Sequence, residues 1–187
     1  MSKKNKKKDE DRLRLALSPE EISSENAHLI DAINTGTPLA CVLISAAALE
    51  NALMSLPRNY FVDCDESKDL FDIGGESDSF SSCYRLAFCL GLIEEEDRDN
   101  LKSIAKIRNL FAHRHTAIDF DNEKVAKECE KLKSKVIDAT GFGNYQGRPR
   151  FSFVAINVYS RLLLTALSTT HRDPCKPYAI GQRVVAK

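Results

Sequence analysis

The sequence predicts an all-α protein with a single helical-bundle domain of five or six helices and a long acidic loop. Three observations lead to this fold class. Apolar residues recur at helical spacing in almost every segment, and capping residues precede several of these segments. The 187 residues also suffice for one core without disulfides or a metal, and 43% hydrophobic with 29% charged residues is typical of a soluble globular protein.

Capping signals delimit the first two helices. Residues 18–21 (Ser-Pro-Glu-Glu) combine a cap serine, a proline at the first helical position and a glutamate three residues after the cap. They predict a helix that runs to about Asn34 and stops at Gly36. A second helix is predicted over residues 37–56, closed by Pro57, and its nearly continuous apolar character predicts a central core helix.

Acidic residues and glycines without sustained periodicity fill residues 57–78, which predicts a long connection with at most a short helix. A helix then starts at Asp78 or Ser79 and stops at Gly91, a residue that tolerates the left-handed conformation of a helix end. Four acidic residues open the next helix, residues 94–113, where they favour the helix dipole.

The last predicted helices cover residues 122–139, an amphipathic charged segment, and residues 151–167, a long apolar one. The expected organisation is a basic N-terminal tail, a helical domain with the candidate motif, a linker with a final helix packed on the bundle, and a basic C-terminal tail. Their boundaries are residues 1–17, 18–140, 141–170 and 171–187.

Charge is unevenly distributed although 27 basic residues balance 27 acidic ones. Residues 1–8 hold five lysines and no acid, residues 142–187 hold seven basic residues and one acid, and residues 9–141 hold 15 basic and 26 acidic residues. The acidic body would repel DNA, so direct sequence-specific DNA binding is not expected, and any nucleic-acid contact is expected at the basic ends.

The composition also indicates which metal or cofactor chemistry and which cellular compartment to expect. Six scattered cysteines without a C-x-x-C pair predict free thiols in a reducing compartment, and no histidine–carboxylate group has metal-ligand spacing, so neither a metal nor a cofactor is expected. The longest apolar run, residues 39–49, is too short for a membrane span, and no secretory signal is present. A cytoplasmic protein is expected.

Arg108 is the sharpest anomaly in the pattern. With 100° per residue, it falls within the apolar stripe marked by Leu101, Ile104, Ala105, Phe111 and Ala112. A charge on a core-facing stripe needs a partner, a cavity or an interface, and Glu50 of the apolar helix is the natural partner. From spacing alone, a structural ion pair is favoured over a functional site.

Asn109 and His113 are four residues apart and share one edge of the helix, whereas Arg108 and His113 diverge by about 140°. Joint action of Arg108 and His113 therefore requires a distorted helix end or two copies of the chain. This predicts a homodimer with the motif helix near the two-fold axis.

The segment Ile107-Arg108-Asn109-Leu110-Phe111-Ala112-His113 resembles the Arg-polar-x-x-x-His motif of the HEPN superfamily. Residues 80–113, with a Leu-Gly-Leu-Ile turn and an acidic helix start, resemble the mannitol operon repressor (MltR) family more closely. Residues 118–122 continue this match, and the resemblance covers about residues 20–135.

The two resemblances imply different functions. The mannitol operon repressor family implies a bacterial regulatory protein that represses transcription through partners, without a helix-turn-helix of its own. The HEPN superfamily implies a dimeric, metal-independent endoribonuclease of a toxin–antitoxin or defence system. Arg108, Asn109 and His113 would then be catalytic, with histidine as general acid or base and arginine at the phosphate. A regulatory protein, an antitoxin or RNA is the expected partner.

The basic ends contain the candidate nucleic-acid contacts. No aromatic residue is interleaved with the N-terminal lysines, so a solubilising tail is favoured there. The C-terminal arginines stand beside aromatic residues and are the better candidates for RNA, although packing against the acidic body explains them equally well. The candidates are Lys3, Lys4, Lys6, Lys7, Lys8, Arg148 and Arg150.

Overall fold

The computed structural model describes residues 19–70, 79–112, 118–134 and 145–175. Within these ranges it contains seven helices and no strand, so the predicted all-α class is confirmed, whereas the predicted number of five or six helices is too low. The helices are α2 (Pro19–Thr35), α3 (Pro38–Tyr60), α4 (Asp65–Asp69), α5 (Phe80–Cys89), α6 (Glu95–Ala112), α7 (Glu123–Glu130) and α9 (Gly147–Ser168).

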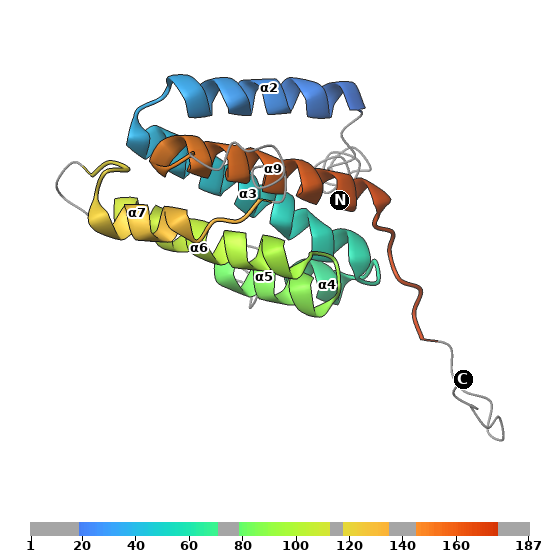
Figure 1. Ribbon diagram of the computed structural model, residues 1–187. Helices are drawn as coiled ribbons and strands as arrows, with labels where there is room; N and C mark the ends of the chain where they lie inside the picture. Colours follow the sequence, from blue (N-terminus) through green and yellow to red (C-terminus); the bar gives the residue numbers. More distant parts are fainter. Residues whose placement is uncertain (1–18, 71–78, 113–117, 135–144, 176–187) are drawn as a thin grey trace.

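The helices stack in three layers (Figure 1). α2 forms one outer layer and packs on α3 and α9, which lie along one another in the middle. α5, α6 and α7 form the other outer layer. Leu49 and Leu53 of α3 and Phe151 and Leu162 of α9 are almost completely buried, so the core lies between the layers and α3 runs through its centre, as predicted.

Capping residues start and end the helices where the sequence indicates. The Thr37 hydroxyl accepts a hydrogen bond from the Ala40 N–H at 3.2 Å, and the Ser79 hydroxyl accepts one from the Ser82 N–H at 3.1 Å. Gly91 ends the α5 region with φ 72°, a conformation that glycine adopts without a steric penalty. These local signals position the turn that leads into α6.

Pro57 does not close α3, in contrast to the prediction. The helix continues to Tyr60, and its last turn closes on the Pro57 carbonyl. Tertiary hydrogen bonds hold this extra turn: the Asn59 amide donates to the Ala166 carbonyl at 3.2 Å, and the Arg172 N–H donates to the Tyr60 carbonyl at 3.0 Å. These contacts from distant residues offset the hydrogen bond that proline cannot donate.

α7 is shorter than the predicted helix and ends at Glu130. The Asn100 side chain of α6 is fully buried and pairs with the Lys133 backbone, donating to its carbonyl at 2.9 Å and accepting from its N–H at 2.8 Å. Arg150 donates to the Leu132 carbonyl at 2.9 Å. α7 does not continue because side chains from α6 and α9 form hydrogen bonds with the backbone groups that a further helical turn would use.

The other predicted boundaries differ less. The connection after α3 contains the short helix α4, as expected, and residues 71–78 lie outside the described part. α9 begins about one turn before the predicted start at residue 151. Residues 135–139 of the predicted charged helix, the N-terminal lysine run and residues 176–187 also lie outside the described ranges.

α3 and α9 are long and apolar enough to cross a membrane by length and composition alone. Half of the most apolar part of each helix is buried inside the bundle, as in core helices of soluble proteins. α3 nevertheless keeps an exposed apolar face near its start, where Leu39, Leu43 and Ile44 expose 38–45% of their surface.

Candidate functional site

The motif helix α6 directs its candidate residues away from the core. Ile104, Ile107 and Phe111 are buried, whereas Arg108 and Asn109 are exposed. The predicted position of Arg108 on a core-facing stripe is therefore wrong. His113 follows the last residue of α6 and lies outside the described residues.

The error arises from the small residues of the helical wheel. Ala105 and Ala112 helped to define the predicted apolar stripe, but Ala105 is only partly buried and Ala112 is exposed. Ile107 and Asn100, on the opposite flank of that stripe, are fully buried. The centre of the buried face therefore lies farther round α6 than predicted. Leu101 and Asp97, which flank Arg108 on the wheel, are nevertheless buried, and Arg108 borders the hollow beside Glu50 instead of the packed core.

Glu50 and Arg108 line the same small hollow between α3, α5 and α6, with a volume of about 120 Å³. Ser79 and Ala105 are among its other lining residues. No nitrogen–oxygen pair between Glu50 and Arg108 lies within 4.0 Å, although both residues are described, so the expected ion pair is not formed. The guanidinium of Arg108 is thus open to solvent beside a partly buried carboxylate.

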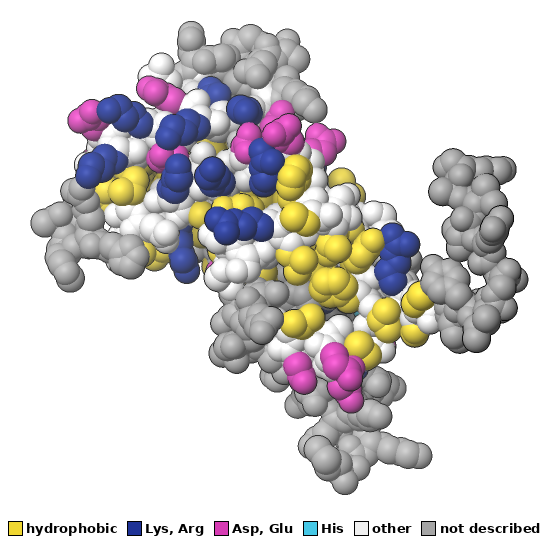
Figure 2. Space-filling model, turned by 90° about the horizontal axis from the view of Figure 1, so that it is seen from below, with side chains coloured by type: hydrophobic (Ala, Val, Ile, Leu, Met, Phe, Trp, Pro, Cys, Tyr) yellow, Lys and Arg dark blue, Asp and Glu magenta, His cyan; other side chains and the backbone are white. Residues whose placement is uncertain are grey.

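A second and larger hollow, of about 630 Å³, lies between α6 and α7, and we call it the α6–α7 groove. Lys and Arg side chains gather at this end of the face shown in Figure 2, whereas apolar side chains gather toward the other end. The groove begins at the motif, because Asn109 is one of its lining residues. The described lining residues are Lys106, Asn109, Leu110, Lys124, Lys127, Glu128 and Lys131.

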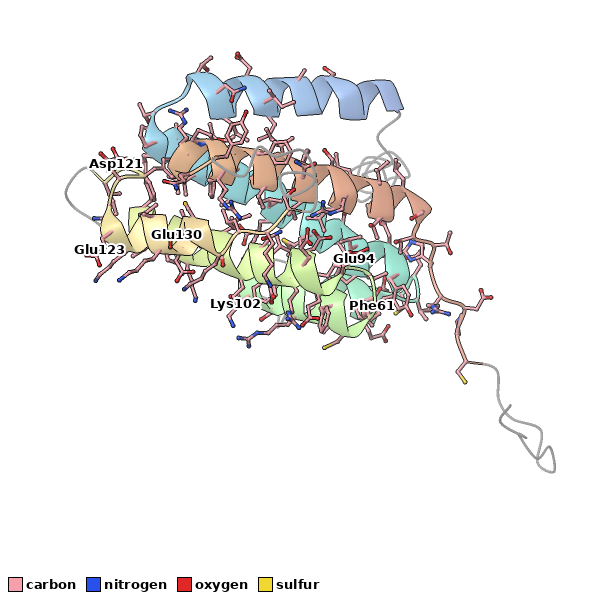
Figure 3. The ribbon with its side chains drawn as sticks, viewed as in Figure 1. Phe61, Glu94, Lys102, Asp121, Glu123 and Glu130 are labelled. Carbon is pink, nitrogen blue, oxygen red and sulfur yellow. The ribbon has the colours of Figure 1, made fainter. Side chains whose placement is uncertain are left out.

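The Glu128 carboxylate forms ion pairs with two lysines of the groove. Glu128 Oε1 lies 2.6 Å from Lys131 Nζ and 3.5 Å from Lys106 Nζ. Its Oε2 atom is buried and has no hydrogen-bond donor among the described residues. Lys127 pairs at 3.0 Å with Glu123, which lies at the outer end of α7 (Figure 3). The groove thus has an excess of positive charge around one incompletely satisfied carboxylate.

The sequence analysis did not find this groove. Lys124, Lys127 and Lys131 recur at spacings of three and four residues, which places them on one edge of α7. That pattern is ordinary for the solvated edge of a charged helix, and only the packing of α6 against α7 brings Lys106 beside it.

The two candidate arginines of the C-terminal segment, Arg148 and Arg150, bind backbone carbonyls. Arg148 Nη2 donates to the Ile33 carbonyl at 2.6 Å and to the Gly36 carbonyl at 2.6 Å, at the end of α2. Arg150 donates to the Leu132 carbonyl, as described above. Both guanidiniums therefore have a structural role, and their predicted contact with nucleic acid is additional to it.

Two cysteines of the core, Cys41 and Cys129, are free thiols, and no group of three metal-ligating side chains occurs among the described residues. Cys41 and Cys129 are buried, and burial raises the pKa of both thiols. Their buried, neutral state is typical of structural cysteines rather than of nucleophiles.

The sequence matches no protein-family model, and no curated protein matches it in sequence. Two solved structures share its fold. A chain of the MtlR–HPr complex from Escherichia coli has a TM-score of 0.56 and 15% identity over 73% of this chain and 97% of that chain. A possible transcriptional regulator, YggD from Shigella flexneri 2a, has a TM-score of 0.51 and 14% identity over 76% of this chain and 96% of that chain.

The chain is therefore similar in fold to MtlR, the mannitol operon repressor, as the sequence resemblance predicted. At these identities the similarity concerns the fold, and function has to be argued from the sites. The resemblance of the motif to the HEPN superfamily stays a prediction.

Proposed function

We propose that this chain is a regulatory protein of the MtlR type that acts in transcriptional repression by binding a partner protein. The observation that supports this most strongly is the fold similarity to MtlR, whose structure was determined as a complex with HPr. The acidic body, with 15 basic against 26 acidic residues in the segment 9–141, opposes direct binding to DNA. A cytoplasmic location belongs to this proposal.

The test uses the purified chain and HPr from the same organism. Isothermal titration should give a one-to-one complex, and duplex DNA from upstream of the gene should not be shifted in a gel at physiological salt. A failure to bind HPr together with a salt-resistant, sequence-specific DNA shift would exclude this function.

A homodimer is the second part of the proposal. Leu39 and Leu43 lie one turn apart near the start of α3 and expose 45% and 38% of their surface, and their burial between two copies would remove this surface from water. Light scattering of the wild type and of Leu43→Glu measures the mass directly. A monomer at micromolar concentration for the wild type would exclude the dimer.

A metal-independent endoribonuclease remains the alternative function, and one observation favours it. Arg108 and Asn109 are both exposed, and Arg108 has no ion pair with Glu50, so its guanidinium is accessible to a phosphate. Incubation of total RNA with the wild type and His113→Ala in EDTA separates the two functions. Cleavage that is lost only in the variant would establish the nuclease, and absence of cleavage by both would eliminate it.

A further inference from the structure

We infer that the α6–α7 groove binds an acidic, amphipathic helical segment of a partner protein. This inference rests on the proposed function, because it names the surface through which a partner would be held. It concerns the surface lined by Lys106, Asn109, Leu110, Lys124, Lys127, Glu128 and Lys131.

Charge complementarity is the first argument. Four lysines and a single carboxylate line the groove, although the segment 9–141 that contains it is acidic as a whole. Glu128 compensates Lys106 and Lys131, and Glu123 compensates Lys127, at separations of 2.6 to 3.5 Å. Carboxylates of a docking segment would add to the contacts of these lysines, whose side chains are 49–67% exposed where they pair, and such complementarity increases association rates and selects against basic partners.

The shape and the floor of the groove provide the second argument. Leu110 is partly buried and packs on the core, so the groove has an apolar floor between lysine rims. A helix with an apolar stripe could place that stripe on Leu110 and its acidic flanks against the lysines of α6 and α7, which is the usual arrangement of a helix in a groove. The volume of about 630 Å³ accommodates several side chains.

The residue types favour a protein segment over RNA. None of the described lining residues is aromatic, so the groove offers no platform for base stacking, and none is an arginine, whose planar fork suits phosphate.

The test measures binding of a fluorescent peptide of about 18 residues, with leucines at helical spacing and glutamates on both flanks, to the full chain by anisotropy. The groove variant is Lys124→Glu/Lys127→Glu. The matched control is Arg85→Glu/Lys102→Glu, which makes the same charge change at exposed positions that do not line the groove; Lys102 extends from α6 in Figure 3. Circular dichroism checks that both variants fold.

The wild type should bind the peptide, and the groove variant should bind it about tenfold more weakly or worse, because two attractive contacts become repulsive. The control should change affinity less than about twofold, because neither Arg85 nor Lys102 lines the groove. A peptide of the same composition without the apolar stripe should bind more weakly than the amphipathic one.

Failure to bind the peptide, or equal binding by the groove variant and the wild type, would overturn the inference. Groove-dependent binding of a single-stranded RNA oligonucleotide without binding of the peptide would assign the surface to nucleic acid instead. The titration with HPr is read separately. Its failure together with the sequence-specific DNA shift removes the proposed function, whereas an HPr complex that tolerates the groove variant removes only this surface as the HPr contact.

Discussion

Arg161 of α9 forms a two-pronged ion pair with Asp97 in the first turn of α6. Its Nε lies 2.9 Å from Asp97 Oδ1 and 3.2 Å from Oδ2, and Nη2 also donates to Oδ1. The Asp97 side chain is only 6% exposed, whereas 40% of the Arg161 side chain is exposed. This pair joins the motif helix to the central helix α9 and fixes the start of α6.

Replacement of this carboxylate should destabilise the bundle. Asp97→Asn leaves the Arg161 charge without its partner, and we expect a loss of about 2 kcal/mol in the free energy of unfolding, less than for a fully buried pair because Arg161 can regain water. Urea denaturation measures the loss. Glu95→Gln, at the exposed pair with Arg98, is the control and should cost less than about 0.5 kcal/mol. Equal effects of the two changes would contradict the assignment.

Arg148 should stabilise the junction of α2 and α3. Its guanidinium caps the end of α2 through the carbonyls of Ile33 and Gly36, where an added Cβ on Gly36 would lie 2.7 Å from the Ala32 oxygen. Arg148→Ala should lower the free energy of unfolding by about 1–3 kcal/mol, because these carbonyls lose a charged donor. Arg148→Lys should recover only part of this stability, since an ammonium lacks the planar fork.

A binding assay separates the structural role of Arg148 from its predicted contact with nucleic acid. The structural role predicts lower stability with unchanged RNA affinity of the folded variant. A lower affinity for single-stranded RNA at unchanged stability would support the contact predicted from the sequence and would contradict the structural assignment.

Asp99 should make the stability depend on acidic pH. The Arg98 guanidinium donates to Asp99 at 2.7 Å and, together with Lys133 at 3.4 Å, lowers the pKa of Asp99 below its ordinary 3.8. The folded carboxyl therefore binds a proton less readily than the unfolded one. Its stabilising contribution is fully present above the unfolded pKa and is lost as the pH falls through the lower, folded pKa.

Comparison of the wild type with Asp99→Asn measures this contribution. The wild type should have the higher free energy of unfolding at neutral pH, and the difference should shrink at successive pH values below 3.8. A difference that is independent of pH would show that the carboxylate charge does not contribute.

The sequence was informative wherever a local signal decides the structure. Thr37 and Ser79 cap the helices that they were predicted to start, and Gly91 provides the left-handed turn before α6. Local sequence signals did not predict the helix ends that are determined by residues distant in the sequence. Asn59 and Arg172 hold the turn beyond Pro57, and no local pattern reports hydrogen bonds across the bundle.

The candidate site shows the same limit. Asn109 is exposed on α6, but His113, with which it was predicted to share an edge, lies outside the described residues. The wheel placed Arg108 on the core side, whereas Arg108 is exposed at the hollow beside Glu50. Lys106 and Lys124 are brought together only by packing of α6 on α7, so their groove has no signature in the chain order. Charges gathered by tertiary packing are therefore the part that sequence reasoning misses.

Cys129 should make the stability depend on alkaline pH. The thiol is almost fully buried, and burial raises its pKa from 9.0 to about 12. The unfolded chain ionises this thiol near 9.0 while the folded protein keeps it neutral, so the stabilising contribution is complete below 9.0 and is lost as the pH rises toward 12.

Cys129→Ala should therefore lose stability less steeply than the wild type above pH 9.0, as measured by urea denaturation. Cys89 is exposed and provides the control for reactivity. Thiol titration at mildly alkaline pH should modify Cys89 rapidly and Cys129 only after unfolding. Parallel pH curves for Cys129→Ala and the wild type, or rapid modification of Cys129 in the folded protein, would contradict the buried neutral thiol.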